Sequence, residues 1–293
     1  SAAVFCGSSS SSVLLPTSPP SPTLAFVSNR SGNHEILLTD TAGGRVVNLS
    51  AHPGLDYHPC WSPDGRRLAF ASDRDGDREI YVMAADGGAP RNLTRHPAKD
   101  SSPAWSPDGS RIVFTSDRDG GRAELYVLDV ERGDVVRLTT NDRYEESPAW
   151  SPDGRLIAFA ALATATGAEA PTLQIFVMDA DGGGERRVVD LAGHASAPRF
   201  SPDGARIAFY GGAGAGFAGA DILTVAPDGS DLRNLTADAE PDWQPDWSPD
   251  GRWIVWARGP GDPLDLWIMR CDGTGRRPLL EAPGRDEQPR WRP

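Results

Sequence analysis

The chain has 293 residues, of which 41 are acidic and 29 basic, giving a formal net charge of −12. This excess of negative charge argues against nucleic acid and against an anionic membrane surface as partners. No apolar run approaches the roughly eighteen residues that a membrane-spanning helix needs.

Residues 1–23 are low in complexity and rich in Ser and Pro, so we expect an N-terminal extension without a core of its own. Cys6-Gly7 followed by a Ser/Pro spacer resembles the start of a bacterial lipoprotein, in which a lipidated cysteine tethers a soluble domain. Ala3-Val4-Phe5 departs from the residues usual before such a cysteine. We therefore expect a tail that tethers or docks the protein, with Cys6 as a candidate lipid anchor. The alternative is a flexible linker left by a secretion signal.

From Leu24 onward the chain repeats the pattern Pro-x-Trp/Phe-Ser-Pro-Asp-Gly. Successive copies start 44 to 50 residues apart, at Pro59, Pro103, Pro148, Pro198 and Pro245, with a truncated copy at Pro289. A repeat of this length made of short strands is typical of β-propeller blades rather than of helical solenoids.

One copy illustrates the expected blade. Residues 104–105, 111–115, 124–128 and 135–138 have strand composition, and Ser106-Pro107-Asp108-Gly109 suits a type I turn. We therefore predict four antiparallel strands in each blade.

The two ends of the repeat region complete one blade. Residues 24–28 match a second strand that lacks a first strand before it, and residues 289–291 match a first strand with nothing after it. We predict an all-β, six-bladed propeller over residues 24–293, closed by the C-terminal strand, with no exposed sheet edge. The recurring aromatic residue of each repeat should pack between blades (Trp61, Trp105, Trp150, Phe200, Trp247 and Trp291).

The three cysteines cannot all pair. Cys60 and Cys271 occupy different positions in non-adjacent repeats, so we expect buried free thiols rather than a disulfide framework.

The repeats resemble those of the TolB β-propeller family, whose unit reads roughly D-x-x-P-x-W-S-P-D-G-x-x-I-A-F-x-S-x-R, then E-I-Y-V-M, D-G-G and L-T. Residues 56–94 follow this unit almost letter by letter. The resemblance implies a propeller that binds proteins of the bacterial envelope, although similar repeats also gate serine peptidases. Fold resemblance alone does not choose among functions.

An acidic residue precedes each repeat proline by three positions in five copies: Asp56, Asp100, Glu145, Asp242 and Asp286. In a propeller this position opens the innermost strand, so these carboxylates should ring one mouth of the channel. They would form either a cation site or funnel, or ion pairs with Arg30, Arg74, Arg118 and Arg258 from loops on the same face.

Two copies lose that arginine and carry long apolar insertions instead, at residues 160–167 and 210–217. We expect these insertions to lie side by side as an uncharged patch that binds a protein partner, with drift in loop length as the alternative. We expect two tryptophans of the last full repeat to be exposed anchors as well, with packing over a hairpin as the alternative. The candidate partner-binding residues are Leu162, Ala163, Thr164, Tyr210, Phe217, Trp243 and Trp253.

No pattern of residues argues for catalysis or for a bound cofactor. His52, His96 and His194 recur at matched points, where propellers of some lyases place metal ligands, but no loop carries two of them. We therefore predict a non-catalytic binding or scaffolding subunit of a periplasmic or envelope assembly. The alternatives are a metal-assisted lyase or hydrolase and a small-ligand binder, each using the central channel.

Overall fold

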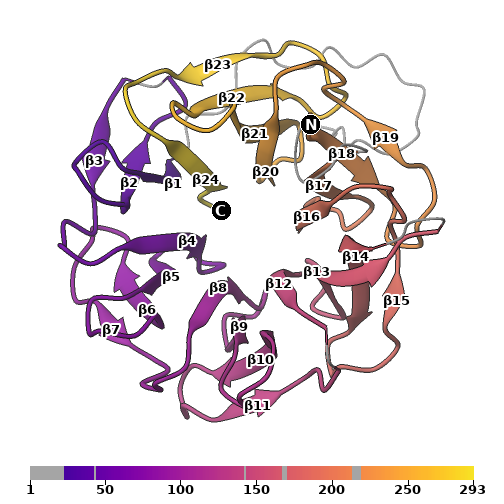
Figure 1. The fold of residues 1–293 in the computed structure, drawn as a ribbon. Coiled ribbons are helices and arrows are strands. Elements are labelled where there is room, and N and C mark those ends of the chain that lie inside the picture. Colours follow the sequence, from indigo (N-terminus) through magenta and orange to yellow (C-terminus); the bar gives the residue numbers. More distant parts are fainter. Residues whose placement is uncertain (1–22, 43, 142, 167–169, 213–218) are drawn as a thin grey trace.

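A computed structural model describes residues 23–42, 44–141, 143–166, 170–212 and 219–293. Within these ranges the chain forms 24 strands in six four-stranded antiparallel sheets, which stand around a central axis (Figure 1). The predicted all-β fold, a six-bladed propeller, is confirmed. The described residues contain no helix that is long and apolar enough to cross a membrane.

Each blade runs from an innermost strand at the axis to an outermost strand at the rim. The first three blades contain β24 (Asp286–Trp291), β1 (Leu24–Ser28), β2 (Glu35–Thr39) and β3 (Val46–Asn48); β4 (Asp56–Trp61), β5 (Arg67–Ser72), β6 (Glu79–Ala84) and β7 (Arg91–Asn92); and β8 (Asp100–Trp105), β9 (Arg111–Ser116), β10 (Glu124–Asp129) and β11 (Val135–Arg137). The last three contain β12 (Glu145–Trp150), β13 (Leu156–Thr164), β14 (Pro171–Asp179) and β15 (Arg186–Arg187); β16 (Ala195–Phe200), β17 (Ile207–Gly211), β18 (Asp221–Val225) and β19 (Arg233–Asn234); and β20 (Asp242–Trp247), β21 (Trp253–Arg258), β22 (Asp265–Arg270) and β23 (Arg277–Leu280).

The ring closes as the sequence predicted. Strand β24 pairs with β1, with Leu24 opposite Trp291 and Ser28 opposite Asp286. The C-terminus therefore lies near the axis (Figure 1), and the first blade is built from both ends of the described chain. Unfolding of either end would open the ring, because each end supplies a strand that the other needs.

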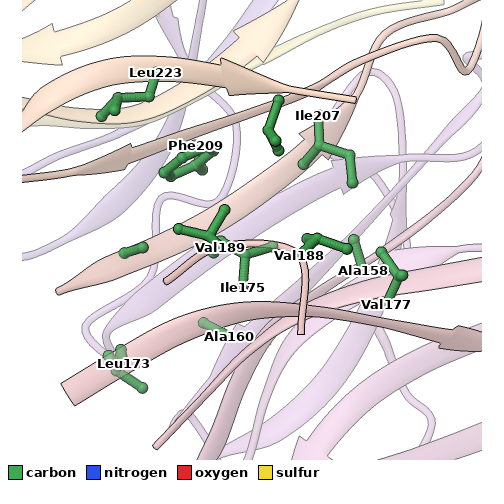
Figure 2. Packing of buried hydrophobic residues seen from close by; sticks show 12 residues of the cluster. Ala158, Ala160, Leu173, Ile175, Val177, Val188, Val189, Ile207, Phe209 and Leu223 are labelled. Carbon is green, nitrogen blue, oxygen red and sulfur yellow. The ribbon is translucent and has the colours of Figure 1, made fainter. Parts of the chain in front are cut away.

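Apolar side chains between neighbouring blades form the core. One fully buried aromatic residue lies in the second strand of each blade: Phe26, Phe70, Phe114, Phe159, Phe209 and Trp256. The repeat tryptophans are also buried between blades, each at most 8% exposed, whereas Phe200 is half-buried. Figure 2 shows the cluster between the fourth and fifth blades, where Ile175 and Val177 face Ile207 and Phe209.

The repeated Ser-Pro-Asp-Gly segment has a structural role. In the third blade the Ser106 hydroxyl donates to Asp108 Oδ1 at 2.6 Å and accepts from the Arg111 backbone N–H at 2.9 Å. Gly109 takes a φ of +71°, which a residue with a Cβ adopts only at a cost. The repeat motif thus holds the turn between the first two strands of a blade, so it carries no information about a ligand.

The two cysteines among the described residues differ. Cys60 is a free thiol, as predicted. Cys271 is disulfide-bonded, which corrects the expectation of a free thiol there.

Candidate functional site

The five carboxylates that open the innermost strands are all fully buried, with side chains that are 0% exposed. Four of them face an arginine from the end of the second strand of their blade or from the loop after it. Arg74 Nη2 lies 3.1 Å from Asp56 Oδ1, and the corresponding pairs are Arg118–Asp100 at 2.9 Å, Arg258–Asp242 at 2.9 Å and Arg30–Asp286 at 2.5 Å. These contacts match the ion-pair alternative for the acidic ring.

Each arginine is held in place by further contacts. Arg74 Nε donates to the Ser72 hydroxyl at 2.9 Å, and its guanidinium lies 5.1 Å from the centre of the Phe70 ring and 4.9 Å from that of Tyr81. Arg118 repeats this arrangement with Ser116, Phe114 and Tyr126. A planar guanidinium that stacks and bonds in this way fastens a loop to the blade beneath it.

Glu145 differs, because Ala163 stands at the position that Arg74 and Arg118 occupy in their blades. Thr139 Oγ1 donates to Glu145 Oε2 at 2.6 Å and Asn141 Nδ2 donates to Oε1 at 2.8 Å, while Arg143 stays 3.7 Å away. Burial raises the pKa of this carboxyl above its ordinary value, and the two hydrogen bonds oppose that rise.

Burial also raises the pKa of Asp242 to about 6, against the lowering effects of the hydrogen bond from Thr236, of Arg258 and of the Trp256 indole. The pKa of Asp286 rises for the same first cause, opposed mainly by Arg30 and Ser28. The acidic ring is therefore a set of buried groups that hold the loops, and its side chains are not exposed to a ligand in the channel.

A cavity of about 530 Å³ lies on the axis within the ring of innermost strands. It opens toward the face that carries the loop between β9 and β10, since Asp117, Gly121 and Arg122 of that loop line it. Its size falls within the range of about 300 to 1,000 Å³ found for small-molecule sites. The cavity therefore satisfies the size requirement for a ligand site.

A backbone feature shapes the wall of this cavity. The third residue of every innermost strand has a φ between +51° and +55°, and none of these residues is glycine: His58, Ser102, Ser147, Ala197, Gln244 and Gln288. The pairing register with the second strand shifts at this point, as a β-bulge requires. All six residues line the cavity. Strained backbone repeated around an axis is the kind of feature that gathers at functional sites.

Five cationic and two anionic side chains line the cavity: Arg78, Lys99, Arg122, Arg199 and Arg290, with Asp117 and Glu146. Arg199 and Arg290 were not among the predicted site residues. The sequence does mark them, because they occupy the variable position of the Pro-x-Trp/Phe motif, which is Cys, Ala, Ala, Arg, Asp and Arg in the six copies. The lining is cationic although the chain as a whole is acidic.

The predicted partner-binding residues lie in two places. Leu162, Ala163 and Thr164 form the end of β13, where Leu162 and Ala163 are half-buried and Thr164 is exposed. Tyr210 belongs to the cavity wall and is only 8% exposed. Phe217 lies outside the described residues.

The two candidate tryptophans of the sixth blade differ in burial. Trp253 is 3% exposed, so the expectation of an exposed side chain there is wrong. It packs in the cluster with Leu266 and Trp291 between the sixth and first blades. Trp243 is half-buried, donates from its indole to the Gly259 carbonyl at 3.0 Å and meets Tyr210 edge-on at 5.4 Å between ring centres.

Two of the three recurrent histidines bond within their own loops, and the third bonds to strand β14 of its blade. Nδ1 of His52, His96 and His194 accepts from the backbone N–H of Gly54, Ala98 and Leu173 respectively, at 3.0 to 3.2 Å. In the ranges described, no three His, Cys, Asp or Glu residues are grouped so that they could hold a metal ion.

Comparison with known proteins places the chain among propellers. A family model for the TolB β-propeller domain matches residues 3–168, and one for the lipoprotein LpqB β-propeller domain matches residues 93–274. A search of curated proteins found no match.

Solved structures share the fold. TolB from Acinetobacter baumannii is 24% identical with a TM-score of 0.78, over 93% of this chain and 67% of that one. A putative TolB from Agrobacterium tumefaciens is 24% identical with a TM-score of 0.71, over 92% of each chain. An oligogalacturonate lyase in complex with manganese is 16% identical with a TM-score of 0.58, over 88% of this chain and 73% of that one.

Proposed function

The chain belongs to the TolB β-propeller domain family, and from that premise we propose that it is a non-catalytic protein-binding subunit of a periplasmic or envelope assembly. The proposed docking surface is the hairpin of β13 and β14 together with Tyr144, which we call the blade-four hairpin. The observation that supports it most is the length of these two strands.

Strands β13 and β14 have nine residues each, whereas the second and third strands of the other blades have five or six. The last pair of β13 with the innermost strand is Glu145 with Ala161. Three more cross-strand pairs follow: Leu162 with Leu173, Ala163 with Thr172 and Thr164 with Pro171. The hairpin therefore projects beyond its blade, on the face where the cavity opens.

Other contacts hold this projection in place. The Leu162 N–H donates to the Tyr144 carbonyl at 3.0 Å, and Arg187 Nη1 donates to the Thr164 carbonyl at 3.0 Å. Thr166 bonds through its backbone N–H to the Asp190 carboxylate at 3.0 Å. Tyr144 is 39% exposed and is one of few large apolar side chains exposed in the described residues. A fixed projection beside an exposed aromatic ring suits a protein partner, because little ordering entropy is lost on docking.

The test replaces the projection with a loop from the same protein. In the second blade, Asp73–Arg78 connects the pair Ser72 and Glu79, which is equivalent to Ala161 and Gln174. Replacing residues 162–173 with these six residues should leave the fold intact and remove a stoichiometric partner that co-purifies with the native chain. The matched control places the same six residues over 117–123 in the third blade, where binding should persist.

Binding that survives replacement of the blade-four hairpin would overturn this surface. Tethering is a separate part of the proposal, supported by the LpqB lipoprotein match and by Cys6-Gly7 in the sequence. Mass spectrometry of the native protein reads the state of Cys6 directly. An acylated Cys6 would support the anchor, and a Cys6 in disulfide linkage would exclude it, because the same sulfur cannot carry both bonds.

A further inference from the structure

Arg199 and Arg290 occupy equivalent positions in the innermost strands of the fifth and first blades. Each donates from Nη1 to the carbonyl of the proline before it, at 2.7 Å. Neither makes an ion pair within 4.0 Å among the described residues. A guanidinium has five N–H donors, so most donors of both groups remain for a ligand in the cavity.

Asp246 is the carboxylate nearest to this pair in ring order, because its strand β20 lies between β16 and β24. One of its oxygens accepts the Trp291 backbone N–H at 2.8 Å. The negative charge of Asp246 raises the pKa of both arginines. Burial and the repulsion by Arg290 outweigh this for Arg199 and lower its pKa to about 9. One carboxylate thus fails to neutralise two cations.

The positive charges of the arginines also act on His58. Burial lowers its pKa to about 3, and Arg290, Arg78 and Arg199 add to this effect in that order. An imidazole next to three guanidinium groups stays neutral at physiological pH, since a further cation would be repelled. The inner end of the cavity is therefore electropositive.

Backbone N–H groups add to this field. The His58 N–H donates to Gln288 Oε1 at 2.6 Å, and the Gln288 N–H donates to Gln244 Oε1 at 3.1 Å. Long amide side chains thus cap the bulged backbone on one side of the ring. On the other side the equivalent residues are Ser102, Ser147 and Ala197, whose N–H groups receive no side-chain cap from the part of the chain that the structure describes.

We propose that this cavity binds a small, multiply charged oxyanion, held by Arg199 and Arg290 together with the uncapped backbone N–H groups of the innermost strands. Di- and tricarboxylates and phosphates share the required chemistry, since both offer oxygens that accept paired N–H donors. The two anionic residues of the lining stay charged, but five cationic side chains outnumber them. Glu146 already accepts from the Ser196 hydroxyl at 2.5 Å, and Asp117 from the Lys99 backbone N–H at 2.8 Å. The site shares Tyr144 with the blade-four hairpin, but it does not depend on the proposed docking function.

Isothermal titration calorimetry of the full chain tests the proposal, with citrate and inorganic phosphate as probes at constant ionic strength set by chloride. We expect one site per chain for at least one probe. Tighter binding of citrate would identify a carboxylate ligand, and tighter binding of phosphate would identify a phosphate ligand. Absence of binding by both probes would overturn the proposal.

The variant Arg199→Gln/Arg290→Gln should weaken binding by about tenfold or more for each arginine, because each loses charge-assisted hydrogen bonds. Arg66→Gln, a change of an exposed arginine outside the cavity, should bind as the native chain does. Should the double variant fail to fold, Arg290→Lys keeps the charge but loses the forked donors and should still weaken binding. Unchanged affinity in these cavity variants would contradict the site.

Discussion

Two sets of buried or half-buried charges in this propeller differ in whether each charge has a partner. At the mouth, Asp56, Asp100, Asp242 and Asp286 each lie within 3.1 Å of an arginine nitrogen. On the axis, Arg199 and Arg290 have no carboxylate at that distance among the described residues. Buried charge that is paired holds loops together, whereas buried charge without a partner costs stability and is better explained by a ligand.

The largest effect should follow from breaking one mouth pair. Asp56→Ala leaves the Arg74 guanidinium, whose side chain is 9% exposed, beside an apolar vacancy. Removing one partner of a buried pair costs about 3 to 5 kcal/mol. Urea denaturation should show this loss in the free energy of unfolding, and a loss below about 1 kcal/mol would mean that the pair is exposed in solution.

Asp242 should make stability depend on pH in a defined direction. Its pKa is raised in the folded state from 3.8 to about 6, so the native protein holds this proton more tightly than the unfolded chain. The stabilisation is complete below about pH 4 and is lost as pH rises through about 6, by about 3 kcal/mol.

Comparison of the native chain with Asp242→Asn isolates this contribution. The difference between their unfolding free energies should change by that amount between pH 4 and pH 7, in the direction of a less stable native chain. A constant difference over this range would show that the pKa of Asp242 is ordinary.

Glu145 should be less sensitive than Asp56, because it has neutral donors in place of a close arginine. Glu145→Ala leaves Thr139 and Asn141 without their acceptor. The expected cost is about 1 to 3 kcal/mol, measured by the same urea denaturation. A cost as large as that of Asp56→Ala would mean that the arginine is not what makes the mouth pairs strong.

The smallest effect concerns the histidines. His96→Ala removes the acceptor for the Ala98 N–H and should cost about 1 kcal/mol. Addition of Zn²⁺ should change the melting temperatures of the native chain and of this variant by the same amount, because we expect no metal at His96. A rise confined to the native chain would restore the metal alternative.

The blades and their closure could be predicted because both depend on a motif that the sequence repeats, Pro-x-Trp/Phe-Ser-Pro-Asp-Gly. The sequence also placed the mouth acids, since Asp56 and Arg74 recur at fixed points. It could not show that Arg199 points into the cavity, because that depends on a bulge with positive φ at Ala197, where no glycine marks it.

The burial of Trp253 was missed for a related reason. The equivalent residues of the second and third blades are Arg67 and Arg111, and an arginine at this position predicts a solvent-exposed site. In the structure the Arg67 guanidinium lies 4.7 Å from the centre of the Trp105 ring, so the position is a packing site for either residue type.

We infer that the mouth charges hold the scaffold together and that the axial arginines do not. The free energy of unfolding of Arg199→Gln/Arg290→Gln, by urea denaturation in chloride buffer without other added anions, tests this most directly. We expect a value within about 1 kcal/mol of the native chain or above it, because the change relieves repulsion between two cations. A loss as large as that of Asp56→Ala would contradict it and would make the axial arginines part of the scaffold.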